Sequence, residues 1–450
     1  MPNSQKPPVS NPAQKMAGSQ SRRRGRNEPA LHACARSNDV EGMKRLLAEG
    51  VSPNERAGVR LIRTPLMLAA SMGHVEATKI LLRVSDLGLR DAHGLDALSH
   101  AATSESMEVL NLILSAGASP AADSETGKTP LHHAALSQRT EMVKRLLPMC
   151  DPNKKDTYGA TPLHLACFDL ADVEPGWSKD TECARLLAAV SAIDEPNDDN
   201  QTPLHYAVRH NRGDCVRVLL SAGADAGWRD KEGNTPLIAA AKSGSVEAIA
   251  DLLAVSDASA RDKEGNTALL IAAAREEPEL VSLLANREDA QMANRDGVTP
   301  LIQASMQGNI EAMRILAPFS DANAQTSEGN TALTHAFWSA NASGIDLLAP
   351  LTDRSGRDPE GRSFIERAAT QSNPDAWRFL APHLSGAELE EMALALMKKI
   401  SPELGARMEG HLLRLEMVAG EAFAPNSAPK SRVGETATQG DEKKKPPLRM

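Results

Sequence analysis

One short sequence pattern recurs along most of this chain of 450 residues: Thr, then Pro or Ala, then Leu, often His, any residue, and Ala. Clear copies begin at Thr64, Thr129, Thr161, Thr202, Thr235, Thr267, Thr299 and Thr331, and degenerate copies at Pro29, Asp96 and Ser363. Most successive copies lie 32 or 33 residues apart. Such a period is typical of a stack of small units, each unable to bury its own apolar face without its neighbours.

Each copy predicts the same local structure, a turn followed by two short helices. An Asp-x-x-Gly sequence precedes the Thr, as in residues 230–235 and 262–267, and its Gly allows the positive φ of a tight turn. The Thr is suited to cap the first helix, with Pro at the first helical position. A Gly or Asn is expected to end that helix, at Asn38, Gly73, Gly244 and Gly308. The second helix ends in an apolar pair such as Leu219-Leu220.

These eleven copies, numbered here as repeats one to eleven from Pro29, resemble the ankyrin repeat family, whose signature is T-P-L-H-x-A at a period of about 33 residues. The resemblance covers residues 28–384. It implies an all-α ankyrin-repeat solenoid of about eleven helix pairs, with hairpin-like finger loops at one edge. Each finger is named by the repeat that it leads into.

The sequence departs from the family pattern after the second helix. The copy at Thr202 is followed by the usual Gly-Ala-Asp, whereas the copies at Thr64, Thr129, Thr235 and Thr299 have Ser-Asp or Cys-Asp there. Most copies are 32 residues long. We expect these copies to end the second helix differently, with the Asp side chain as the cap.

The regions outside the repeats divide into two tails and a helical segment. Residues 1–27 and 425–450 are rich in Pro, Ser and basic residues and are expected to be disordered. Residues 385–424 predict two amphipathic helices, the first with a capping box of Ser385 and Glu388 and the second from Pro402 to about residue 422. We interpret 385–424 as a C-terminal helical cap on the last repeat; a dimerisation or partner-binding helix is the alternative.

Charge and cysteine content favour a cytoplasmic chain that does not bind nucleic acid along its length. Residues 28–424 hold 38 basic and 56 acidic residues, an excess that repels phosphate and leaves only the basic tails for such contacts. The five cysteines lack CxxC spacing, which is typical of reduced cytosolic thiols. The longest apolar run, Leu269–Ala274, is too short to span a membrane, and the N-terminus has no apolar signal segment. We expect a cytoplasmic monomer.

No motif predicts a catalytic, cofactor or metal site. His32, His132, His164 and His205 occupy the fourth motif position, and the resemblance implies hydrogen bonds within and between repeats rather than metal binding. The segment Glu125–Thr129 resembles part of a phosphate-binding loop, but Ala122 stands where that loop needs Gly.

An insertion makes repeat five 41 residues long, and the extra residues 169–179 carry Trp177. Inserted solenoid loops often bind partners, although neutral loop growth explains them equally well. Trp228 lies in the finger between repeats six and seven.

The family resemblance places partner contacts on the finger tips and the first helices. Carried to this sequence, the positions are Tyr158, Lys231, Glu232, Asn234, Lys263, Glu264 and Asn266 on the fingers, and His133, Phe168, Tyr206, Arg209, His210 and Lys242 on the first helices. Trp228 on a finger and Trp177 in the insertion are further candidates. The resemblance places the insertion opposite the fingers, so the two tryptophans are not expected to form one patch. Aromatic and Arg side chains are frequent interface anchors.

The sequence leaves three functions open. The first is a protein-binding scaffold or adaptor that uses the concave face of the solenoid. The second is a secreted effector that binds host proteins, with the tails as its export or address signals. The third is an enzyme with a C-terminal appendage, which residues 385–450 disfavour because they show no nucleophile–base pair. We predict the first, with no enzymatic activity and no cofactor.

Overall fold

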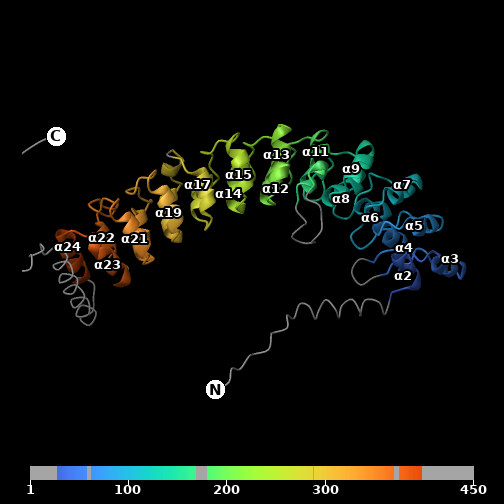
Figure 1. Ribbon diagram of the computed structural model, residues 1–450, viewed down its shortest axis with the longest axis horizontal. Coiled ribbons are helices and arrows are strands. Elements are labelled where there is room, and N and C mark those ends of the chain that lie inside the picture. Colours follow the sequence, from blue (N-terminus) through green and yellow to red (C-terminus); the bar gives the residue numbers. More distant parts are fainter. Residues whose placement is uncertain (1–27, 58–61, 169–179, 287, 369–373, 398–450) are drawn as a thin grey trace, which may run out of the picture. The chain divides into compact units, whose positions relative to one another are not determined.

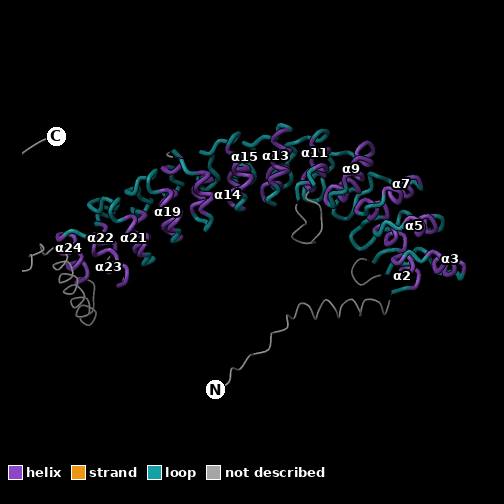
Figure 2. Tube along the Cα trace, in the orientation of Figure 1, coloured by secondary structure: helices purple, strands orange, loops and turns teal. Residues whose placement is uncertain are grey.

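The computed structural model describes residues 28–57, 62–168, 180–286, 288–368 and 374–397. Helices and loops alternate along these residues, and they contain no strand beyond two isolated bridges, Ala57 with Arg63 and Arg357 with Ser363 (Figure 2). The predicted all-α fold is therefore confirmed. The chain divides between Asp353 and Arg354 into two compact units, which are described separately.

The first unit contains ten helix pairs, one for each of repeats one to ten (Figure 1). The first helices are α2 (Ala30–Ser37), α4 (Pro65–Ser71), α6 (Ala97–Thr103), α8 (Pro130–Leu136), α10 (Pro162–Ala166), α12 (Pro203–Arg209), α14 (Pro236–Ser243), α16 (Ala268–Ala273), α18 (Pro300–Gln307) and α20 (Ala332–Trp338). The second helices are α3 (Val40–Ala48), α5 (Val75–Leu82), α7 (Met107–Ser115), α9 (Thr140–Leu146), α11 (Glu182–Ala188), α13 (Gly213–Ser221), α15 (Val246–Leu253), α17 (Pro278–Leu284), α19 (Ile310–Leu316) and α21 (Ala342–Leu348). Short 3₁₀ turns follow α9 and α17, as η1 (Leu147–Met149) and η2 (Asp289–Gln291).

Neighbouring repeats pack helix on helix. Each first helix contacts its own second helix and the first helix of the next repeat, and each second helix contacts the next second helix. The surface that the first helices line is called the inner-helix face below. The core consists of Leu, Ile, Val and Ala from both helices; Leu204 and Leu219, for example, are fully buried. No described helix is long and apolar enough to cross a membrane.

The motif Thr begins the first helices as predicted. Thr235 and Thr299 are N-caps whose Oγ1 atoms accept from the amides of Ile238 and Ile302, and Pro follows at the first helical position. In α14 and α18 the helix ends at a left-handed glycine, Gly244 and Gly308, with φ of 77° and 71°. Asn38 does the same for α2.

The exit from the second helix differs from the expectation. A left-handed glycine follows not only α13 but also α3 and α7, at Gly223, Gly50 and Gly117. After α5 the chain turns without any left-handed residue, and Asp86 Oδ1 accepts from the amide of Gly88, 2.8 Å away. The predicted Asp cap is wrong, because a carboxylate and the carbonyls at a helix end are both acceptors. The Asp instead closes the turn that follows.

The second unit holds repeat eleven and the start of the predicted cap. It consists of α22 (Phe364–Ala368), α23 (Pro374–Leu380), η3 (Ala381–His383) and α24 (Gly386–Met397), and α22 contacts α24. Ser385 and Glu388 form the predicted capping box, with the Ser385 amide 2.8 Å from Glu388 Oε2. The second helix predicted after Pro402 lies outside the described residues.

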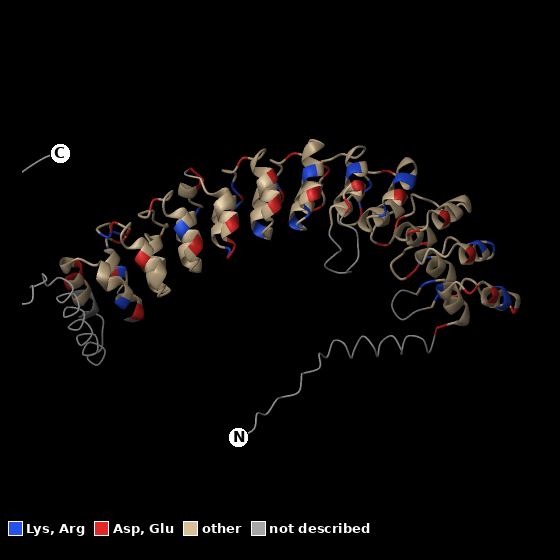
Figure 3. Ribbon diagram, viewed as in Figure 1, with Lys and Arg blue, Asp and Glu red and all other residues tan. Residues whose placement is uncertain are grey.

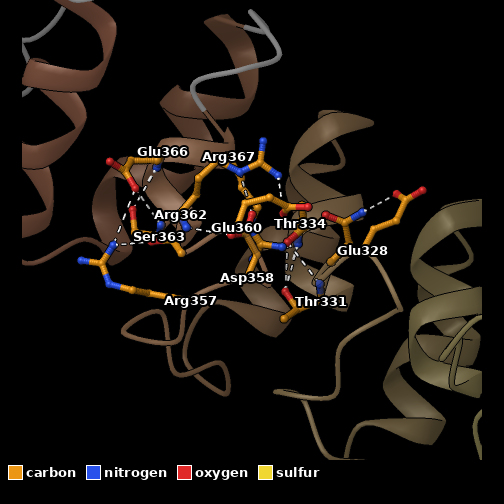
Figure 4. A network of polar contacts seen from close by, with 12 residues as sticks. Glu328, Thr331, Thr334, Arg357, Asp358, Glu360, Arg362, Ser363, Glu366 and Arg367 are labelled. Atoms are coloured by element: carbon orange, nitrogen blue, oxygen red, sulfur yellow. Dashed lines mark hydrogen bonds and ion pairs between the residues drawn. The ribbon is translucent and has the colours of Figure 1, made fainter.

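Polar contacts order the finger of this unit (Figure 4). The buried carboxylate of Asp358 accepts from Arg362 Nε at 2.7 Å, and Arg367 Nε lies 3.8 Å from the same oxygen. Ser363 and Glu366 exchange hydrogen bonds at 2.8 and 3.0 Å at the start of α22. This reciprocal pair replaces the Thr-Pro start that six of the other repeats have.

Candidate protein-binding surface

A polar residue at the base of the turn holds the finger loops, and it is buried in fingers three to eight. In finger seven, Asp230 Oδ1 accepts from the amides of Glu232 and Asn234 at 3.0 and 2.8 Å. In finger five, Asp156 accepts from two amides and from Lys128 Nζ. Burial alone would raise the pKa of Asp156, but these hydrogen bonds outweigh it, so its pKa lies below the ordinary value. The fingers are therefore ordered loops.

Backbone hydrogen bonds join consecutive fingers. The amide of Lys231 donates to Asp199 O at 3.0 Å, and the amide of Lys263 donates to Glu232 O at 3.0 Å. Arginines add a second link, since Arg229 Nη1 donates to Gly233 O of its own finger and to Arg261 O of the next. The finger tips consequently form a row with fixed spacing.

Aromatic rings meet on the inner-helix face of repeats five and six. The rings of Phe168 and His210 lie 4.1 Å apart, and Tyr206 lies 5.9 Å from His210 and 5.0 Å from His164. Tyr206 Oη accepts from Asn197 Nδ2 at the base of finger six, 3.3 Å away. Phe168, Tyr206 and His210, called the aromatic cluster below, are half-buried and present part of each ring on the surface.

The predicted contact residues differ in exposure. Exposed are Tyr158, Arg209, Lys231, Glu232, Lys242, Lys263 and Glu264; half-buried are Phe168, Tyr206, His210, Trp228 and Asn266. Trp177 and the insertion at 169–179 lie outside the described residues. The structure brings Phe168, Tyr206 and His210 together, whereas Trp228 lies on a finger and donates from Nε1 to Asn200 O at 3.1 Å.

His133 and Asn234 are buried, and their assignment to the binding surface needs correction. His133 is only 9% exposed, and burial lowers its pKa to about 3. Asn234 is 6% exposed. Its Nδ2 donates to Asp230 Oδ2 at 2.9 Å, and its Oδ1 accepts from Lys242 Nζ at 2.6 Å. Both side chains are therefore withdrawn from the surface that a partner could contact.

The same registers point to residues that the sequence analysis did not select. The residue seven positions after the motif Thr is Met306 in repeat nine, which is 44% exposed, and Trp338 in repeat ten, which is half-buried. The Trp338 ring packs edge-on against His335, 5.3 Å away. Phe168 and Arg209 also lie seven positions after the motif Thr, and applying this spacing to every repeat identifies Met306 and Trp338.

The motif histidines link repeats. In repeats four to six, Nδ1 of His132, His164 and His205 accepts from the motif Thr, and Nε2 hydrogen-bonds a carbonyl of the next finger at 3.0 to 3.2 Å. Burial lowers the pKa of His132 and His164 to about 4 and also lowers that of His205. Among the described residues, no group of three His, Cys, Asp or Glu side chains is placed to hold a metal ion.

Comparison with known proteins decides the family. A family model for ankyrin repeats matches residues 31–123, 120–173, 177–230, 221–296 and 270–359, which is most of the chain. The chain belongs to the ankyrin repeat family. Ankyrin repeats generally mediate contacts between proteins.

Several longer ankyrin proteins are similar to this chain. Human transient receptor potential cation channel subfamily A member 1 is 27% identical over 264 residues, which is 50% of this chain and 23% of the channel subunit. Human SH3 and multiple ankyrin repeat domains protein 2 is 29% identical over 46% of this chain and 11% of that protein. Ankyrin repeat protein nuc-2 of Neurospora crassa is 30% identical over 48% of this chain and 20% of that protein. The chain spans less than a quarter of each of these relatives.

Proposed function

We propose that this ankyrin chain is a protein-binding scaffold or adaptor, and that its partner lies on the inner-helix face and the finger tips of repeats five to eight. The stack and the finger row are ordered before a partner arrives, so binding immobilises little of the chain itself. We assign it no catalytic role.

The aromatic cluster is the observation that carries this proposal. The whole chain has 12 aromatic residues, 6 Phe, 4 Trp and 2 Tyr, yet two of them, Phe168 just after α10 and Tyr206 in α12, meet beside His210, which follows α12. The other tyrosine lies on finger five. Half-buried rings fixed by their neighbours provide contact area at little entropic cost, which is why such residues dominate interface energetics.

A photo-crosslinking experiment tests the location. A photoreactive amino acid is placed at Arg209 in the full chain, next to the aromatic cluster, and a second version carries it at Arg217 on α13. Basic and acidic positions both occur along the second helices (Figure 3). Arg217 on α13 pairs with Asp251 on α15 at 3.2 Å. We expect a partner from native cells to crosslink at 209 and not at 217.

A matched pair of variants tests the contribution of the cluster. Tyr206→Ala combined with His210→Ala removes two rings that are partly exposed, and we expect loss of the crosslinked partner while the helical signal remains. Glu247→Ala with Arg217→Ala changes two exposed residues of second helices and should retain the partner. Equal retention by both variants would place the binding surface elsewhere.

A further inference from the structure

Finger five presents an exposed aromatic ring, that of Tyr158. Tyr158 is 63% exposed, and Lys128 Nζ lies 5.4 Å from the centroid of its ring. Lys128 is held in place by Asp156 Oδ2, 2.8 Å from its Nζ. The ring therefore already faces one cation of this chain, and most of the Tyr158 residue remains open to solvent.

A carboxylate from finger six lies against the backbone beside this ring. The amide of Asp198 donates to Tyr158 O at 3.1 Å. A Cβ atom at Gly159 would come within 2.6 Å of Asp198 Oδ1, and Gly159 has φ of 73°. Only glycine permits this approach, so Gly159 fixes the Asp198 carboxylate next to the Tyr158 finger.

Two carboxylates of finger six, those of Asp198 and Asp199, have no cationic partner within the described part of the chain. Asp198 and Asp199 are both exposed and take part in none of its ion pairs. Lys128 pairs with Asp156, and Lys155 pairs with Glu195 at 2.7 Å. Lys231 of finger seven, whose amide donates to Asp199 O, takes part in no ion pair of the described residues. Asp198 and Asp199 can therefore form ion pairs with a partner.

We infer that the junction of fingers five and six, formed by Tyr158, Gly159, Asp198 and Asp199, is a subsite for an arginine side chain of the partner protein. This inference rests on the proposed function and adds a partner chemistry to it. The guanidinium lies on the open surface of the Tyr158 ring and donates to the finger-six carboxylates. The residues beside that arginine in the partner reach the aromatic cluster, whose Tyr206 is hydrogen-bonded to Asn197 of the same finger.

Arginine fits this arrangement better than lysine. Its planar guanidinium stacks on an aromatic face while its N–H groups point outward in the ring plane, toward carboxylates at the ring edge. Two N–H groups can also donate to one carboxylate in parallel. An ammonium group satisfies the charge alone, without the planar stacking.

Fluorescence anisotropy with defined peptides tests the subsite. The probes are short labelled peptides, each with one central arginine flanked by varied apolar residues, and the same peptides with citrulline or lysine in its place. Citrulline keeps the planar shape and removes the charge. We expect the peptides that bind the full chain to lose about tenfold in affinity with citrulline, and less with lysine. A lack of binding by every arginine peptide would overturn the inference.

Matched variants assign the effect to the junction. Asp198→Asn with Asp199→Asn keeps the shape of finger six, and we expect it to reduce affinity about as much as citrulline does. Asp296→Asn with Glu328→Gln makes the same change on the tips of fingers nine and ten, outside the proposed surface, and should leave affinity unchanged. Citrulline must have no further effect on the Asp198→Asn, Asp199→Asn protein if arginine binds there.

Failure of this inference is distinguishable from failure of the proposed function. If a partner binds the Asp198→Asn, Asp199→Asn protein but not the Tyr206→Ala, His210→Ala protein, that result would support the inner-helix surface and rule out the arginine subsite. Binding of the partner by both variants would rule out the proposed surface as well.

Discussion

Leu204 shows how a single side chain of this stack contributes to stability. It is fully buried in α12, which packs against α10, α13 and α14. Truncation leaves a cavity that neighbouring helices fill only in part, so we expect Leu204→Ala to lower the free energy of unfolding by about 2–5 kcal/mol. Urea denaturation followed by circular dichroism measures the change.

Arg209 in the same helix is the matched control for that substitution. Its side chain is exposed, and we expect Arg209→Ala to change the free energy of unfolding by less than about 0.5 kcal/mol. An unchanged denaturation midpoint for Leu204→Ala would contradict the register of the repeats.

At the scale of residues, the sequence predicts the core better than the binding surface. The motif positions follow the helical period, so the burial of Leu204 and its equivalents follows from spacing alone. Whether His133 or Asn234 is exposed depends on the neighbouring repeat, because His133 and Tyr206 share one register and differ in burial. The approach of Asp198 to Gly159 depends on how two fingers meet, which no local pattern specifies.

At the scale of single helices, Gly308 is a residue whose conformation determines where α18 ends. Its φ of 71° is favourable for glycine and costs an L-residue about 1–2 kcal/mol. A Cβ there would meet only Asn341 Nδ2 at 3.5 Å, an ordinary contact distance, so backbone strain is the main effect. We expect Gly308→Ala to lower the free energy of unfolding by about that amount in urea denaturation.

Gly308→Asn separates backbone strain from a general effect of adding a side chain. Asn38 and Asn211 adopt φ of 58° and 51° in this chain, which shows that Asn tolerates the conformation here. The Asn variant should therefore be more stable than the Ala variant despite its larger side chain. The opposite order would mean that crowding, and not strain, decides the effect.

The ends of the helices were predictable to different degrees. Motif Thr, Pro and Gly residues act through local hydrogen bonds and φ preferences, so the starts of α14 and α18 and their ends follow from the sequence. The exit after α5 does not follow from the sequence. Its shorter loop uses the Asp86 side chain in the turn, and the Asp86 amide donates a hydrogen bond to Asn54 Oδ1 of the preceding repeat. That second contact involves residues 32 positions apart.

At the scale of the whole stack, the repeats are chemically unequal at one buried position. The fourth motif residue is His132, His164 and His205 in repeats four to six, and Ile238, Leu270 and Ile302 in repeats seven to nine. Both sets are buried, but only the histidines titrate. Because each repeat contacts only its neighbours, stability is distributed locally along such a stack. Acid should therefore affect its parts differently.

The sign of the effect follows from proton binding. Burial lowers the pKa of His132 and His164 to about 4, whereas the unfolded chain titrates these groups near the ordinary value of 6.5. Between these values the unfolded chain binds more protons, so the free energy of unfolding falls as the pH drops from 6.5 toward 4 and is unaffected above that window. The lowered pKa of Asp156 acts separately, below its ordinary value of 3.8.

Hydrogen exchange across this window tests whether acid loosens repeats four to six before repeats seven to nine. As the pH falls from about 7 to about 4.5, we expect amides of α8, α10 and α12 to lose protection first, after correction for intrinsic exchange rates, while α14, α16 and α18 keep theirs. His164→Leu removes one titrating group from repeat five. It also removes hydrogen bonds to Thr161 and Gln201, so its stability at neutral pH falls, but its dependence on pH should become shallower. Uniform loss of protection along the stack would show that the repeats unfold together and that the histidines do not set the order.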